Sequence, residues 1–234
     1  MRAPVNPSAK GQAGMSLVEL LIGITLGLFI TGAGITAFVV HLRESRALIA
    51  QSRLMQDLRA ATDLITRDLR RAGYWGDAAA GVWPRDSETG AGGAASNPYS
   101  AMAVSRLAGP AVTFRFSRDA IENGSVDDNE QFGYRLRGGT LELQLSAGRW
   151  QAMTDPNAMK VTRLEIVPTE QVVDLGDSCR VPCPVPSATC PPRLHVRSVT
   201  VTVAARSTTD AASERTVRSS VRLRNDEVTG SCPA

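Results

Sequence analysis

An uninterrupted apolar stretch near the N-terminus constrains the fold of this chain more than any other feature. The 21 residues from Leu20 to Val40 include no ionisable side chain. As an α-helix this stretch is about 31 Å long, which matches the thickness of the hydrocarbon core of a bilayer. We therefore expect residues 15–42 to form a hydrophobic helix that lies in a membrane or among other apolar helices.

A short polar segment precedes this helix. Residues 1–14 contain Arg2 and Lys10 and no acidic side chain. An ordinary secretory signal has its small-residue cleavage site after the apolar run, whereas here the candidate site, Ala13-Gly14, comes before it. Cleavage at that site would leave the apolar helix on the mature protein as an anchor. We expect residues 1–14 to be a cleaved leader peptide.

The helix is predicted to continue beyond the apolar stretch as an amphipathic helix over residues 43–73. No Pro or Gly occurs from His41 to Ala72, and Gly73 is a plausible stop signal. Apolar residues recur at steps of three and four, the period of one helical face: Leu54, Leu58, Ala61, Ile65, Leu69 and Ala72. We expect one continuous helix from Met15 to Ala72, with a second half that needs a domain to pack against.

Residues 74–234 are predicted to form a β-rich globular domain. Residues 76–110 are rich in Ala, Gly, Ser and Pro and are expected to be a long connecting loop. Gly138-Gly139 predicts a two-residue hairpin turn. Alternating or β-branched segments predict strands at 111–116, 132–137, 140–145, 161–167, 194–204 and 216–224. The expected fold class is α+β, with a long helix packed on an antiparallel sheet.

All four cysteines lie late in the chain, at positions 179, 183, 190 and 232. Cys179, Cys183, Cys190 and Cys232 are candidates for disulfides, and their three possible pairings cannot be distinguished by sequence. Their spacing is not typical of a zinc site. Disulfides persist in oxidising compartments, so we expect the domain to lie outside the cytoplasm.

Composition and motifs argue against several functions. The net charge is only +3 and the arginines are scattered, so no direct nucleic-acid binding is expected. The acidic run Asp127-Asp-Asn-Glu130 lacks the alternating ligand spacing of a calcium loop and is predicted to be a solvated turn. No nucleophile elbow, phosphate loop or two-histidine metal motif occurs. We expect no enzyme activity, no metal and no cofactor.

The start of the apolar helix resembles the processing motif of a known family. Gly14-Met-Ser-Leu-Val-Glu19, followed by the apolar run, resembles the type IV prepilin motif, also called a class III signal peptide. The resemblance implies cleavage after Gly14 by a membrane aspartyl peptidase and N-methylation of Met15. It also implies that Glu19, at the fifth mature position, pairs with the amino terminus of a neighbouring subunit during assembly.

Two further segments extend the resemblance. Leu58 to Gly76 and Ser219 to Asn225 are similar to the corresponding parts of PilW-type minor pilins. Gln12-Ala13 stands where many family leaders have Lys or Arg. Major pilins usually have a helix-kinking Pro about twenty residues into the mature chain, and none occurs here between Met15 and Ala72. The pattern thus resembles a minor subunit.

The resemblance implies a minor pilin in the complex that initiates pilus assembly and sits at the pilus tip. Its expected partners are the prepilin peptidase, other minor pilins and the major pilin through the N-terminal helix, and a tip adhesin. The protein would span the bacterial inner membrane once, with a periplasmic C-terminal domain, before entering the extracellular pilus. Two alternatives remain: a J-type minor pseudopilin of type II secretion, and a membrane-anchored extracytoplasmic binding or sensor protein.

Overall fold

The computed structural model describes residues 14–81, 95–107, 109–185, 189–209 and 213–233. The predicted leader therefore lies outside the described residues, apart from Gly14. The chain divides into two compact units, Met1–Ile49 and Ala50–Ala234, and each is described by itself.

Helix α1, Leu17–Leu69, has 53 residues and is three residues shorter at its C-terminal end than the predicted helix. The chain then tightens into turns, because the N–H groups of Arg71 and Ala72 donate to carbonyls only three residues earlier. Gly73 follows with a φ of 77°, the left-handed conformation that commonly terminates a helix. The expected stop signal is therefore present, with the last helical turn replaced by this capping arrangement.

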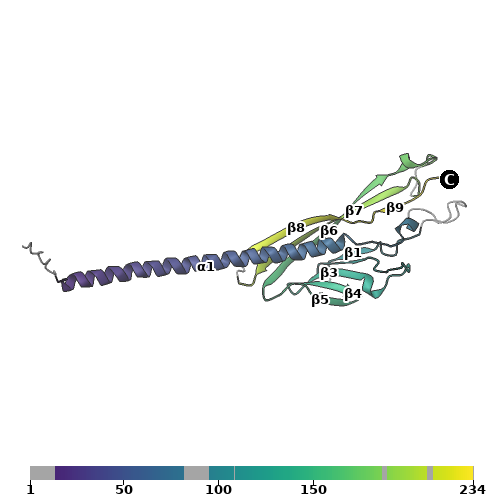
Figure 1. The fold of residues 1–234 in the computed structure, drawn as a ribbon. Helices are drawn as coiled ribbons and strands as arrows, with labels where there is room; N and C mark the ends of the chain where they lie inside the picture. Colours follow the sequence, from purple (N-terminus) through teal and green to yellow (C-terminus); the bar gives the residue numbers. More distant parts are fainter. Residues whose placement is uncertain (1–13, 82–94, 108, 186–188, 210–212, 234) are drawn as a thin grey trace, which may run out of the picture. The chain divides into compact units, whose positions relative to one another are not determined.

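The β-strands of the second unit form two antiparallel sheets rather than the single sheet that was expected (Figure 1). The five-stranded sheet has the order β1-β2-β3-β4-β5, with strands Met102–Ser105, Ala111–Arg115, Gln131–Arg137, Thr140–Ser146 and Arg149–Ala152. The other sheet has the order β6-β7-β8, with strands Met159–Asp174, Arg193–Ser207 and Glu214–Arg222, and β9, Glu227–Thr229, also pairs with β7. Three short 3-10 helices complete the fold: η1 Ala78–Gly81, η2 Asp128–Glu130 and η3 Gly176–Ser178. The predicted α+β class is confirmed.

One hydrophobic core joins the amphipathic half of α1 to both sheets. Leu58, Ile65 and Leu69 on the predicted helical face are fully buried. They share the core with side chains of both sheets, among them Val112, Phe114, Tyr134, Val199, Val201 and Val221. The helix therefore covers an apolar surface that neither sheet could bury alone.

The strands depart from prediction where their side chains are not buried. The segment expected to be a loop contains η1 and β1, although residues 82–94 of it lie outside the described residues. Strand β6 continues seven residues past the predicted end at Val167, through Pro168, with every side chain from Val167 onward exposed. Proline is tolerated there because β6 pairs only with β7 and is an edge strand. The Gly138-Gly139 hairpin is confirmed, and both glycines have positive φ.

The four cysteines form two disulfides in the structure, Cys179–Cys232 and Cys183–Cys190. The first closes a separation of 53 residues and ties the C-terminal segment to the connection that follows β6. The second closes a separation of seven residues within that connection. Cross-links of this kind stabilise the fold chiefly by restricting the unfolded chain.

Candidate functional site: the apolar helix and the polar cluster at its C-terminal end

The residues of the prepilin-like motif lie at the N-terminal end of α1. Gly14 and Met15 precede the helix, and the carbonyl of Ser16 accepts the first helical hydrogen bond, from Leu20 at 3.1 Å. Glu19 is in the first turn, where a carboxylate interacts favourably with the partial positive charge of the helix end. Within the described part of the chain, no salt bridge involves Glu19. A full positive partner for this carboxylate must therefore come from outside the described residues or from another molecule.

The apolar part of α1 presents hydrophobic side chains in every direction within its own unit. Large apolar residues from Met15 to Val40 are all exposed, with Phe29 at 80%. The hydroxyls of Thr25, Thr31 and Thr36 donate to carbonyls of the same helix, so these polar groups are already satisfied. By length and composition the helix is able to cross a membrane. Its surface suits lipid or other apolar helices.

A polar cluster at the end of α1 holds the segment that resembles PilW-type pilins. The carbonyl of Gly73 accepts hydrogen bonds from the amides of Asn97, at 2.9 Å, and Asn225, at 2.7 Å. The guanidinium of Arg197 donates to the carbonyls of Ser100 and Asn225, each at 3.1 Å. Sequence reasoning missed this cluster, because its members are single polar residues far apart in the chain.

A buried tyrosine extends this region. Tyr99 is fully buried, and its hydroxyl donates to Glu122 at 3.0 Å. Burial acts to raise the pKa of Glu122, but hydrogen bonds from the Ser117 hydroxyl, the N–H groups of Gly76 and Gly124, and Tyr99 outweigh it and lower that pKa. The charged carboxylate of Glu122 therefore fixes the segment after α1 against the loop that follows β2.

Tyr134 makes a second link, between β3 and α1. Its hydroxyl donates to Asp68 at 2.6 Å. Burial raises the pKa of Tyr134, and the hydrogen bond to Asp68 raises it further. The protonated phenol therefore stabilises the folded domain fully below the ordinary tyrosine pKa of about 10, and this stabilisation is lost as the pH rises beyond it.

We accordingly expect the melting temperature of the domain to fall more steeply between about pH 9 and 11 in the wild type than in Tyr134→Phe. Thermal unfolding followed by circular dichroism measures both slopes. The pKa of Tyr99 is also raised by burial, so its contribution is common to the two proteins and cancels in the comparison. Equal slopes would contradict the role assigned to the Tyr134 hydroxyl.

The acidic run Asp127–Glu130 and the histidine His195 make hydrogen bonds within the second unit. The run Asp127–Glu130 contains η2, and the buried Glu130 carboxylate accepts hydrogen bonds from the backbone N–H groups of Arg118 and Asp127.

The ring of His195 on β7 makes two contacts with neighbouring strands. Its Nδ1 lies 3.0 Å from the carboxylate of Glu170 on β6, and its Nε2 lies 2.8 Å from the hydroxyl of Thr229 on β9. These contacts link the three strands β6, β7 and β9. Trp75 packs in a small cluster with Ala80 and Tyr99, and Trp83 lies outside the described residues.

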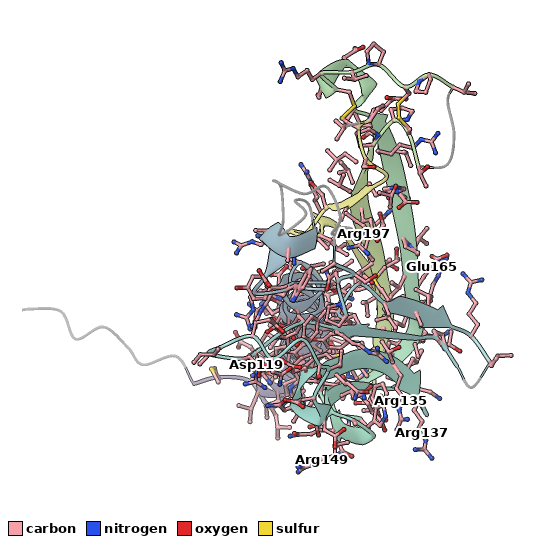
Figure 2. All side chains as sticks on the ribbon, turned by 90° about the vertical axis from the view of Figure 1, so that its right-hand side faces the viewer. Asp119, Arg135, Arg137, Arg149, Glu165 and Arg197 are labelled. Carbon is pink, nitrogen blue, oxygen red and sulfur yellow. A yellow bond between two sulfur atoms is a disulfide. The ribbon has the colours of Figure 1, made fainter. Side chains whose placement is uncertain are left out.

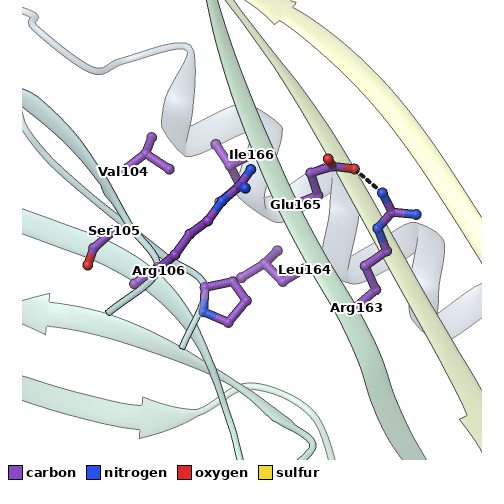
Figure 3. A pocket seen from close by; sticks show the side chains of 9 residues that line it. Val104, Ser105, Arg106, Arg163, Leu164, Glu165 and Ile166 are labelled. Carbon is purple, nitrogen blue, oxygen red and sulfur yellow. Dashed lines mark hydrogen bonds and ion pairs between the residues drawn. The ribbon is translucent and has the colours of Figure 1, made fainter. Parts of the chain in front are cut away.

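A cavity of about 230 Å³ lies between the outer edges of the two sheets, at β1 and β6 (Figure 3). Its walls include Val104, Leu164 and Ile166, with Arg106 extending across it. Arg163 and Glu165 form an ion pair at 2.5 Å along β6. The lining is thus mostly apolar, with its one ion pair already formed. Across the described residues, no cluster of three or more His, Cys, Asp and Glu side chains is placed to hold a metal ion.

Comparison with known proteins identifies the family. The family model described as prepilin peptidase-dependent protein B matches residues 47–223, which is well over half of the chain. The chain belongs to this family. The matched region begins in the second half of α1 and contains strands β1 to β8, so it does not include Gly14, Met15 or Glu19. No curated protein and no solved structure matches the chain. Membership of the prepilin peptidase-dependent protein B family makes this chain a type IV pilin-associated protein, related to a pilus or pseudopilus.

Proposed function

We propose that this member of the prepilin peptidase-dependent protein B family is a PilW-type minor pilin of a type IV pilus. The observation that carries the proposal is that two separate parts of the chain both point to prepilins. Residues 14–19 resemble a prepilin cleavage motif and precede an exposed apolar helix. Residues 47–223 match, independently, a family whose name refers to prepilin peptidase. The proposed role is structural and involves no catalysis or cofactor.

In this proposal the peptidase cuts after Gly14 and Met15 becomes the N-methylated first residue. The apolar part of α1 then holds the subunit in the inner membrane, with residues 74–234 in the periplasm. On assembly the helix leaves lipid and packs against the helices of other minor pilins and the major pilin. The subunit belongs to the minor-pilin complex that initiates the filament and remains at its tip, where it contacts an adhesin.

Processing provides the first test. The full-length chain is expressed with and without an active prepilin peptidase, and its N-terminal peptide is analysed by mass spectrometry. We expect an N-methylated Met15 terminus only when the peptidase is active. Gly14→Val should prevent cleavage, whereas Gly11→Val, three residues earlier in the leader, should not. A terminus at Met1 in the presence of the active enzyme would reject the pilin assignment and favour an anchored binding or sensor protein.

The identity of co-purifying proteins then separates the two filament systems. We expect the processed full-length protein, extracted in detergent, to co-purify with other minor pilins. Recovery of type II secretion pseudopilins in their place would assign the chain to the J-type pseudopilins. That result would leave the processing reaction unchanged, so the two experiments test different parts of the proposal.

A further inference from the structure

A trough crosses the face of the five-stranded sheet that points away from the core. The strand register aligns Ala103, Thr113, Gly133, Gln144 and Trp150 in one row across β1 to β5. The partners on the alternate rows, such as Phe114 and Tyr134, are buried in the core, so this row faces the opposite side. Small side chains at Ala103 and Thr113 leave a depression on this face.

The glycine in this row leaves room for the side chains of Gln144 and Trp150, which lie close above it. A methyl group at Gly133 would lie 3.0 Å from Oε1 of Gln144, 3.1 Å from the ring of Trp150 and 2.7 Å from the carbonyl oxygen of Val112. The indole of Trp150 therefore reaches across from the edge strand to lie beside the bare backbone of β3. The guanidinium of Arg135 stacks on the same indole, 4.2 Å from the ring centre, and holds it in place. Figure 2 shows Arg135 on this sheet, with Arg137 and Arg149 nearby.

A cavity of about 190 Å³ occupies the trough. Its polar lining is Thr113, Arg115, Gln131 and Gln144, and its small apolar lining is Ala101 and Ala103, with parts of Phe114 and Phe132 beneath. All of these residues are described, and the lining contains one cation and no acidic side chain. The electrostatic character of the cavity is therefore weakly positive.

Gln144 is the unusual member of this lining. It is 7% exposed, yet its side-chain amide makes no hydrogen bond with any described residue. Its amide atoms are not enclosed by protein, so they can be reached from the cavity. Arg115 and Gln131 are half-buried, and neither side chain forms an ion pair or hydrogen bond within the described part of the chain. Three polar side chains thus line one small cavity and bond no described residue, so they are available to a ligand or to water there.

We propose that this trough binds a single acidic sugar unit, a monosaccharide ring that carries a carboxylate. Each glutamine amide both donates and accepts, which matches the hydroxyl groups of a sugar ring. The Arg115 guanidinium supplies the charged donor for the carboxylate. The alanine methyl groups face the apolar C–H edges of the ring, and the cavity volume admits about one such ring. This binding activity is separate from filament assembly.

Titration of the full-length protein in detergent micelles tests the proposal. Sodium glucuronate is added while the indole N–H signal of Trp150, assigned with Trp150→Phe, is followed by nuclear magnetic resonance. We expect a saturable shift with a dissociation constant of about 1 mM, typical of a small polar ligand with one charged contact. Glucose, which lacks the carboxylate, should bind at least about tenfold more weakly.

Two variants and one control locate the ligand. Gln144→Met keeps the side-chain length and removes the amide, and Arg115→Met removes the charge at a half-buried position where the fold tolerates change. Each should weaken glucuronate binding about tenfold or more. Arg149→Met removes an exposed arginine of the same sheet outside the cavity lining and should have no effect. Absence of a saturable shift, equal binding of glucose and glucuronate, or full binding by Arg115→Met would overturn the proposal.

Discussion

Replacement of Glu19 by glutamine is expected to leave processing intact and to abolish incorporation into the filament. The side chain keeps its size but loses its charge, and α1 carries no other acidic group before Glu44. A carboxylate beside an apolar helix is costly to transfer out of water unless a positive partner neutralises it. The proposed partner is the new amino terminus of a neighbouring subunit, which glutamine cannot pair with electrostatically.

The measurement compares the amount of the subunit in sheared filaments with the amount in the membrane fraction. Glu44→Gln, an exposed change further along the same helix, is the matched control and should be incorporated normally. If Glu19→Gln entered filaments at the wild-type level, the charge of Glu19 would have no part in assembly. Failure of cleavage in this variant would instead place the residue in recognition by the peptidase.

Leu58→Ala is expected to cause a large loss of stability. Leu58 is fully buried where the amphipathic half of the helix meets both sheets. Removing a leucine side chain from such a position costs the lost burial plus the cavity left behind, about 3 kcal/mol in the free energy of unfolding. A loss of this size is a large part of the total stability of a domain.

Chemical denaturation of the domain, followed by circular dichroism, measures this loss. Leu145→Ala on β4 is the matched control, because that leucine is 47% exposed. Its truncation should change the free energy of unfolding by less than about 0.5 kcal/mol. Similar losses in the two variants would show that the helix does not complete the core.

The sequence alone predicted elements whose side chains alternate between a buried and an exposed side. The helical face at Leu54, Leu58 and Ile65 and strand β8 follow this rule, and the turn at Gly138-Gly139 was predicted from its two glycines. Strands β1, β5 and β9 were missed because they are short and mostly exposed. With no core to face, their residues carry no period-two apolar pattern.

The division of the strands into two sheets could not be predicted from the sequence either. No local signal shows that β5 pairs only with β4 and that β6 begins a second sheet with β7, since pairing depends on residues far apart in the chain. The trough on the five-stranded sheet was not predicted for the same reason, because it depends on pairing between distant residues. Gly133, Gln144 and Trp150 are unremarkable in sequence and become neighbours only through the register of three strands. The prepilin-like motif, by contrast, is contiguous and could be identified directly.

The polar cluster around Gly73 has a consequence for the timing of folding. Asn225, which bonds the Gly73 carbonyl, is 152 positions later in the chain, and Arg197 reaches the same place from β7. A ribosome makes α1 first and these partners among the last residues. The end of the helix therefore stays incompletely bonded until nearly the whole chain has been made, and closure over such a separation is slow. A chain interrupted late in synthesis would therefore have a complete apolar helix and an incomplete domain.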